Sequence, residues 1–306
     1  MGHLSRSKSL AASLIKHLAA KVYIQCVNNR NWPDINLPFS ELISLPIDEL
    51  EAQSVKYDLD IVIADLPQHT DDKQLSILRR LNIPLICVDD LTDRRLLATV
   101  NFYPPISQLN KLNWDGFQGS NWIGWDYCVL NSDLKQSLVR SRSKPKLLIS
   151  LGGSDAFGLH IMISENIQTL LTNFDIDFVV GPLVDLSESE VHLMSFSGLI
   201  VHHNPSNFLS MLARSDFCLV TYGVTVYELA YLKVPTIVIT TCADHEESGK
   251  IFWDDYSGFS HVSAKSSNLN EDITQSLCRL KAGEKYEFPM FHQSINNKIV
   301  QTIKEI

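Results

Sequence analysis

Short continuous runs of apolar residues alternate with stretches of helical periodicity along most of the chain. Residues 7–20 carry apolar side chains at every third or fourth position, a spacing that predicts an amphipathic helix. The apolar runs are bounded by Asp and Asn and are typical of strands buried on both faces of a parallel sheet. In the first half these predicted strands are Val22–Val27, Leu59–Ala64 and Pro84–Val88, with a helix over 71–81. This alternation predicts an α/β fold with doubly wound parallel sheets.

A basic, Ser-rich segment, Lys135–Lys146, interrupts the alternation, and its charge pattern is typical of a solvated linker. The alternation then restarts. The second set of predicted strands covers 146–151, 176–180, 198–201, 217–221 and 236–241. The second set of predicted helices covers 156–171, 205–214, 225–232 and 244–256. The sequence therefore predicts two domains, residues 1–140 and 141–306, and the last helix is a candidate to pack back on the first domain.

Charge and composition exclude several classes of protein. The 306 residues are 45% hydrophobic and 20% charged, and the net charge of −9 argues against broad nucleic-acid binding. The apolar runs are too short to span a bilayer and no signal peptide is visible, so a cytoplasmic protein is expected. No histidine has metal-ligand spacing with neighbouring acids, so no metal site is expected. The six cysteines lack any C-x-x-C pair and are expected to be reduced, mostly buried thiols; they are Cys26, Cys87, Cys128, Cys218, Cys242 and Cys278.

A Gly-His pair opens the first predicted helix, in the sequence Gly2-His3-Leu4-Ser5-Arg6. Glycine lets a ligand approach the backbone closely, and unpaired amides at a helix N-terminus attract anions. A neutral imidazole facing a cleft is suited to act as a general base. An exposed histidine with no role explains the same residue equally well from the sequence alone.

A Gly-Gly turn follows the first strand of the second domain, at Gly152, Gly153 and Ser154 before Asp155. A turn from strand to helix presents amides to a phosphate at the carboxyl edge of a sheet, where open α/β sheets bind ligands. A tight turn without a ligand is the alternative, because two glycines do not make the full dinucleotide fingerprint.

A third motif runs from Tyr222 through Gly223, Val224 and Thr225 to Glu228. Glu228 on the first helical turn could accept both ribose hydroxyls of a nucleotide. The spacing Thr-x-x-Glu is also that of a capping box, which would satisfy helix amides without a ligand. The pair Asp244 and Glu247 could cap the next helix in the same way.

The order and spacing of these motifs resemble one family, the GT-B-fold UDP-sugar hydrolase of pseudaminic acid biosynthesis. Its wider relatives include GT-B glycosyltransferases similar to the peptidoglycan N-acetylglucosaminyl transferase. The segments Val88–Arg94 and Asp126–Leu130 also look like that hydrolase family, so the resemblance covers nearly the whole chain. It implies two Rossmann-like domains facing a cleft and an enzyme of surface-polysaccharide synthesis or flagellin glycosylation.

The resemblance also implies the roles of individual residues. His3 would be the catalytic base that activates water, in a metal-independent hydrolysis without cofactor that releases UDP and a free 2,4-diacetamido-2,4,6-trideoxy sugar. Glu228 would hold the ribose. The other residues expected to bind the UDP-sugar are Gly2, Arg6, Gly152, Gly153, Ser154, Gly223, Val224, Thr225, Asp244 and His245.

Three features depart from the family pattern. Asp65-Leu66-Pro67 stands where the hydrolase has Asp-His-Tyr, so the tyrosine near the sugar is absent. Tyr222–Thr225 replaces a Gly-Gly-Ser-Thr loop. The Gly-His loop lacks the strand that precedes it in this fold, and a missing central strand would leave backbone groups unpaired on both neighbours. We therefore expect roughly ten further residues upstream that form an apolar strand.

Two other functions stay open at this point. One is a GT-B glycosyltransferase that moves a sugar from UDP to an acceptor, and the aromatic segment Phe102–Tyr127 could then face that acceptor. Packing at the domain junction explains the same aromatics. The other is a non-catalytic protein that binds a nucleotide sugar.

Overall fold

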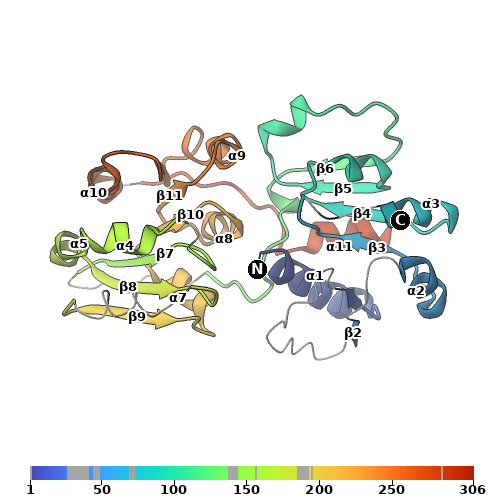
Figure 1. Cartoon of the computed structure of the whole chain (residues 1–306), viewed down its shortest axis with the longest axis horizontal. Helices are drawn as coiled ribbons and strands as arrows, with labels where there is room; N and C mark the ends of the chain where they lie inside the picture. Colours follow the sequence, from blue (N-terminus) through green and yellow to red (C-terminus); the bar gives the residue numbers. More distant parts are fainter. Residues whose placement is uncertain are drawn as a thin grey trace. The chain divides into compact units, whose positions relative to one another are not determined.

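Parallel strands and helices alternate along the chain in the computed structural model (Figure 1). The structure describes residues 2–25, 41–43, 49–68, 70, 73–136, 144–155, 157–184, 193, 196–283 and 285–306. Two units divide the chain. Unit 1 contains residues 1–132 and 291–306, and unit 2 contains residues 133–290.

Unit 1 has two parallel sheets. The larger has four strands in the order β3-β4-β5-β6, at Val62–Ala64, Leu85–Val88, Val100–Tyr103 and Ser120–Ile123. The smaller pairs β1, Tyr23–Gln25, with β2, Glu41–Ile43. Every residue of β4 and β5 is buried, which explains why these strands are continuous apolar runs.

Four α-helices accompany these sheets among the described residues. They are α1 (Gly2–Leu18), α2 (Leu50–Tyr57), α3 (Ile77–Arg80) and α11 (Asn297–Lys304). Single turns of 3-10 helix cover Lys73–Ser76, Asp93–Leu97, Ser107–Lys111 and Trp125–Tyr127. The apolar stripe of α1 packs into a core with β4, β5 and α11, where Leu10, Phe102 and Ile299 meet.

Helix α11 is fixed against α1 by one buried side chain, that of Asn296. Its Oδ1 accepts from the amide of Leu130 at 3.1 Å, and its Nδ2 donates to the Leu130 carbonyl at 3.0 Å. The same Nδ2 lies 3.1 Å from Ser9 Oγ and 3.2 Å from Ser13 Oγ on α1. Residues at the two ends of the chain therefore share one polar network inside unit 1.

Unit 2 has one six-stranded parallel sheet in the order β12-β11-β10-β7-β8-β9. Its strands, in chain order from β7 to β12, are Lys146–Ser150, Asp175–Val180, Leu199–His203, Phe217–Thr221, Thr236–Thr240 and Phe259–Ser263. The helices α4, α5 and α7 to α10 are Leu159–Ser164, Ile167–Asn173, Phe208–Arg214, Val224–Leu232, Ala243–Trp253 and Leu269–Ala282. This is a doubly wound sheet with β7 at its centre.

The predicted fold class is confirmed, and so are most of the predicted strands. The helix predicted over 156–171 is wrong as one element. It consists of α4 and α5, because Gly158 has a left-handed φ of 65° before α4 and Asn166 leaves helical geometry before α5. The first predicted strand, Val22–Val27, is described only as far as Gln25. Residues 137–143 of the predicted linker lie outside the described part of the chain.

The five cysteines in the described residues are free thiols. Cys87, Cys128 and Cys218 are buried, Cys242 is half-buried and Cys278 is exposed. Burial raises the pKa of the Cys128 and Cys218 thiols, which keeps them protonated. Cys26 lies outside the described residues.

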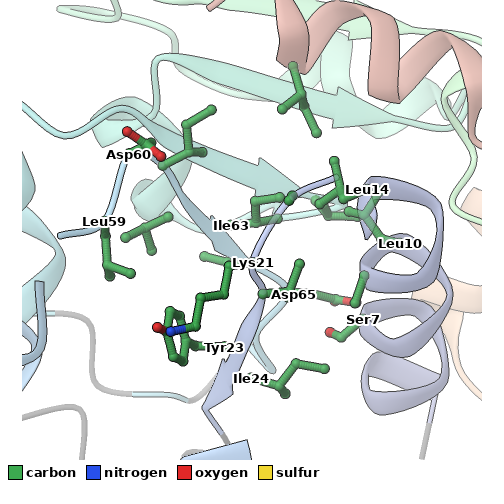
Figure 2. Close-up of a pocket in the computed structure, with 18 of the residues that line it drawn as sticks. Ser7, Leu10, Leu14, Lys21, Tyr23, Ile24, Leu59, Asp60, Ile63 and Asp65 are labelled. Atoms are coloured by element: carbon green, nitrogen blue, oxygen red, sulfur yellow. The ribbon is translucent and has the colours of Figure 1, made fainter. Parts of the chain in front are cut away.

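A cavity of about 760 Å³ lies between the two sheets of unit 1 (Figure 2). Residues of β1 and β3 line it together with side chains of α1 and α2. In the described part of the chain, β1 pairs with β2 and β3 pairs with β4, and neither pairs with the other. Val22–Ile24, from the first predicted strand, and Leu59–Ala64, the second, flank this cavity.

Candidate functional site

The start of α1 lies at the carboxyl end of β3, where His3 meets Asp65. His3 Nδ1 is 2.6 Å from Asp65 Oδ1, a separation that requires a proton between the two atoms. In the neutral imidazole Nδ1 therefore donates to Asp65, and Nε2 carries the lone pair. The His3 side chain is 42% exposed whereas that of Asp65 is 5% exposed. A solvent-accessible imidazole is thus held by a buried carboxylate.

Arg6, one turn further along α1, joins two carboxylates of the same sheet edge. Its Nη2 and Nε donate to Asp65 at 2.6 and 3.1 Å, and its Nη1 donates to Asp89 at 2.8 Å. Burial alone would lower the pKa of Arg6, but the charges of Asp89 and Asp65 outweigh it and raise that pKa. Arg6, which we expected to bind substrate, therefore uses its guanidinium to position Asp65 and Asp89.

Asp65 and Asp89 are candidate site residues that the motif analysis did not select. Asp65 follows β3 directly and Asp89 follows β4 directly. Since the carboxyl ends of parallel strands meet at one edge of a sheet, their positions were a usable signal. Their shared partner on α1, Arg6, could not be predicted from the sequence, because the contact depends on how that helix packs on the sheet.

In unit 2 the Gly-Gly turn follows the central strand β7. Gly152 has a left-handed φ of 91°, and a Cβ there would lie 3.3 Å from Thr221 Oγ1 at the end of β10. Gly181, after β8, leaves no room for a Cβ against the carbonyls of Gly152 and Gly153. The turn is therefore enclosed between the carboxyl ends of β10 and β8, the two strands that flank β7.

The helix after this turn begins later than predicted. Helix α4 starts at Leu159, and Asp155 accepts hydrogen bonds from the amides of Leu159 and His160 at 2.8 and 3.0 Å. The side chain of His160 is fully buried beside Asp155 at 2.6 Å. Asp155 thus occupies the amides at this helix start, and the Gly-Gly turn can present only its own backbone to a ligand.

Helix α8 has an open N-terminus at Gly223. Gly223 is its N-cap, no side chain caps the helix, and a Cβ at Gly223 would meet nothing within 4 Å. The first amides of a helix have no carbonyl partner within it, so those of Val224 and Thr225 are available to an anion. The capping box between Thr225 and Glu228 is not formed, because the helix begins one residue before Thr225.

Glu228 is a buried acid on α8. It is 5% exposed, and no hydrogen bond or ion pair reaches its carboxylate from the described residues. Burial raises its pKa from 4.5 to about 7. An ionisable group held without a partner lowers stability, and such groups concentrate at binding and catalytic sites.

The start of α9 lies at the carboxyl end of β11, on the same edge of the sheet as the start of α8. Asp244 and His245 lie in its first turn, Cys242 is the N-cap, and no side chain caps this helix either. His245 Nδ1 is 3.0 Å from Thr241 Oγ1, and its ring lies 5.2 Å from that of Tyr222. Burial lowers the pKa of His245, although Asp244 offsets part of this effect.

Tyr222 connects the two helix starts. Its ring packs on His245 of α9, and its hydroxyl lies 2.8 Å from that of Tyr227 on α8. Gly223–Thr225 and Asp244–His245, which are about twenty residues apart in sequence, are therefore close in space. Tyr222 and Thr241 were not selected as site residues, although each immediately follows an observed strand, β10 and β11.

The structure thus assigns the expected residues to two sites, one in each unit. Gly2, His3 and Arg6 belong to unit 1, and the remaining expected binding residues belong to unit 2. Within the described ranges, no three His, Cys, Asp or Glu side chains are grouped to hold a metal ion. No described helix combines the length and the apolar character that a membrane crossing requires.

The chain resembles one curated protein in part of its sequence. "Uncharacterized protein MJ1062" of Methanocaldococcus jannaschii is 27% identical over 128 residues, which are 39% of this chain and 26% of that protein. The chain therefore matches about a quarter of the length of this relative. No family model matches the chain.

Solved structures match nearly the whole chain. MurG of Acinetobacter baumannii has a TM-score of 0.65 at 13% identity, covering 100% of this chain and 96% of its own. The spinosyn forosaminyltransferase SpnP has a TM-score of 0.62 at 10% identity, covering 90% and 86%.

The chain has a GT-B-like fold.

The GT-B-like fold also includes the UDP-GlcNAc 2-epimerase of Methanocaldococcus jannaschii, with a TM-score of 0.56 at 13% identity over 89% of this chain and 86% of that one. The fold class predicted from alternating strands and helices is thereby confirmed. The sites at His3 and at α8 both lie where GT-B-like units, as doubly wound sheets, are expected to bind ligands, at the carboxyl ends of their strands.

Proposed function

We propose that this protein is a UDP-sugar-dependent enzyme that transfers the sugar from UDP to the hydroxyl of an acceptor. The observation that carries the proposal is the pair of His3 and Asp65, an accessible imidazole oriented by a buried carboxylate. A base held in this way is the requirement for activating a hydroxyl nucleophile. Transferases and an epimerase named for a UDP-sugar are among the proteins of the same fold, which supports the substrate class.

Unit 2 carries the proposed nucleotide-binding site. The open N-terminus of α8, with the amides of Val224 and Thr225, would hold the diphosphate, and the backbone of Gly152–Ser154 would contact it from the neighbouring turn. Glu228 would accept the ribose hydroxyls, because its carboxylate has no partner within the described residues. Asp244 and His245 would contact the nucleotide from α9.

Unit 1 supplies the proton transfer. His3 Nε2 would take the proton of the acceptor hydroxyl as its oxygen bonds to the anomeric carbon. The bond from that carbon to the β-phosphate oxygen breaks, and its electron pair leaves with UDP. Asp65 would stabilise the imidazolium that forms, and Arg6 would hold Asp65 in place. Gly2 would allow the ligand to approach the backbone at this helix start.

A second function uses water in place of the acceptor hydroxyl. The motif Gly2-His3-x-x-Arg6 favours it, because this motif resembles the hydrolase of pseudaminic acid biosynthesis. His3 would then activate water, and the products would be UDP and a free 2,4-diacetamido-2,4,6-trideoxy sugar. The proton and electron balance is the same as in the transfer.

UDP release from UDP-sugars, with and without acceptor sugars, distinguishes these functions. Release that depends on acceptor supports the transferase, and release in water alone supports the hydrolase. Replacement of His3 by Asn should lower turnover by roughly a hundredfold or more while UDP affinity is retained. His17→Asn, at the exposed far end of α1, is the matched control. UDP binding without any turnover under both conditions would contradict both proposals and favour a binding protein.

A further inference from the structure

Arg94 is a buried arginine in the 3-10 turn Asp93–Leu97, which follows β4. Its side chain is 1% exposed, and so is that of Asp90, whose Oδ2 accepts from Arg94 Nε at 2.6 Å. Asp90 is fixed in turn, because its Oδ1 accepts from the amide and the hydroxyl of Thr92 at 2.9 and 2.7 Å. A charge buried this deeply lowers stability unless its hydrogen-bonding groups are paired, so the other donors of Arg94 need acceptors as well.

Those other donors bind the chain segment that follows β3. Arg94 Nη1 donates to the carbonyl of Thr70 at 3.0 Å, and Nη2 donates to the carbonyl of Pro67 at 3.0 Å. Nη2 also lies 3.4 Å from the carbonyl oxygen of Leu66, the residue next to Asp65. One planar guanidinium thus holds three carbonyls of this segment, an arrangement that the single ammonium of a lysine cannot reproduce.

Asp65 depends on this segment because it lies just past the end of its strand. The register of β3 with β4 ends at the pair Ala64 and Cys87, so Asp65 is the first residue beyond the ladder. His3 and Arg6 contact the Asp65 carboxylate, but the same helix, α1, carries both of them. The residues that follow Asp65 therefore decide where its backbone lies relative to the sheet, and the buried guanidinium holds them in place.

The next residue in the chain provides an internal comparison. Arg95 is 3% exposed, and its Nη1 lies 2.9 Å from Asp93 Oδ1. Its Nη2 donates to the carbonyl of Asn113. Two consecutive buried arginines thus each join a carboxylate to loop carbonyls, but of the two it is Arg94 that binds the segment beginning at Asp65.

We propose that Arg94 is a positioning residue for proton transfer at His3. It holds the three carbonyls that follow Asp65, and this places the Asp65 carboxylate where it accepts from His3 Nδ1 and leaves the lone pair on Nε2. The inference rests on the proposed function, in which His3 is the base. The tautomer of the imidazole can nevertheless be measured without any substrate.

The test compares Arg94→Lys with Arg95→Lys. Lysine keeps a positive charge beside Asp90 or Asp93 but removes the planar fork. Arg94→Lys should introduce the Nε2–H tautomer of His3 beside the Nδ1–H tautomer, and Arg95→Lys should leave Nδ1–H alone. Long-range ¹H–¹⁵N spectra at about pH 8.5, where imidazoles are neutral, distinguish the two tautomers. The signals of His3 are those that His3→Asn removes.

Stability and turnover are measured on the same proteins. Both substitutions should lower the melting temperature by a similar amount, since each weakens one buried arginine's contacts. Arg94→Lys should also lower kcat by roughly tenfold to a hundredfold with UDP affinity unchanged, because a misplaced base slows the chemical step and leaves nucleotide binding intact.

A double substitution decides the question if Arg94→Lys does not fold. Asp90→Asn combined with Arg94→Gln removes both charges together, so no unpaired charge is left buried. It also takes the guanidinium away from the three carbonyls, and it should introduce the same Nε2–H tautomer of His3.

Two results overturn the proposal. One is a folded Arg94 variant in which His3 is still the Nδ1–H tautomer alone, and the other is the same tautomer change in Arg95→Lys. A natural protein in which His3 is already a mixture of tautomers overturns it as well. Absence of turnover in the natural protein, with and without acceptor, contradicts the proposed function instead, because the tautomer is read in the free protein.

Discussion

Replacement of Glu228 by Gln should stabilise the free protein, by an amount that increases with pH. The Glu228 carboxyl is 5% exposed and has no described partner, and burial raises its pKa from 4.5 to about 7. A difference of this size corresponds to about 3 kcal/mol between the two protonation states. Gln removes the charge and retains the shape of the side chain.

The direction of the effect follows from proton binding. Between pH 4.5 and 7 the folded protein holds a proton on Glu228 that the unfolded chain has released. The stability of the natural protein therefore falls as pH rises through this window. The gain from Gln should be about 1.5 kcal/mol at pH 5.5 and about 3 kcal/mol at pH 8.

Urea denaturation at the two pH values measures these free energies of unfolding. Glu165→Gln, which removes an exposed carboxylate of the same unit, is the matched control and should change stability by less than about 0.5 kcal/mol at either pH. Calorimetry should show the opposite effect on ligand binding, with UDP affinity reduced by roughly tenfold to a hundredfold, since a charged acceptor to the ribose is lost. A Gln variant that is less stable than the natural protein at pH 8 would refute the reasoning, because Glu228 must then have a partner.

Three further substitutions test the sites separately. Asp65→Asn should lower turnover by roughly a hundredfold to ten-thousandfold with UDP affinity unchanged, because the amide no longer fixes the His3 tautomer; steady-state kinetics measure it. Gly152→Ala should cost about 1–2 kcal/mol in denaturant unfolding and weaken UDP binding, since its φ is 91°. Asp155→Ala should cost about 1 kcal/mol through the lost cap of α4, and unaltered stability would contradict that role.

Buried apolar strands gave the clearest sequence signal, although β5, which is buried at every position, was missed and β9, which is only partly buried, was predicted. β4 is apolar throughout, β11 is apolar at its three central positions, and both are wholly buried, so their sequences carry the signal directly. β6 was missed because it is fully exposed, and β12 was missed because Ser260 and His261 interrupt its apolar pattern. Such strands are defined by their neighbours in the sheet, which the local sequence does not contain.

The same distinction between local sequence and long-range packing applies to the candidate site residues. The glycines after strands and the histidine at a helix start could be selected from the sequence, because their positions depend only on the neighbouring strand or helix. The capping box at Thr225 was a wrong alternative, because the backbone at Gly223 starts the helix and leaves Thr225 inside it. The partnership of His3 with Asp65 joins residues that are 62 positions apart, and only the packing of α1 on the sheet reveals it.

The network around Asn296 has a consequence for the order in which the protein is made. Unit 2 is one continuous stretch, 133–290, whereas unit 1 needs α11 from the far side of that stretch. A ribosome delivers residues in sequence, so unit 2 can fold while Asn296 is still in the exit tunnel. Until then, Ser9 and Ser13 lack their contacts with the Asn296 amide, and the apolar stripe of α1 lacks its cover. The first half to be synthesised is therefore the last to become native.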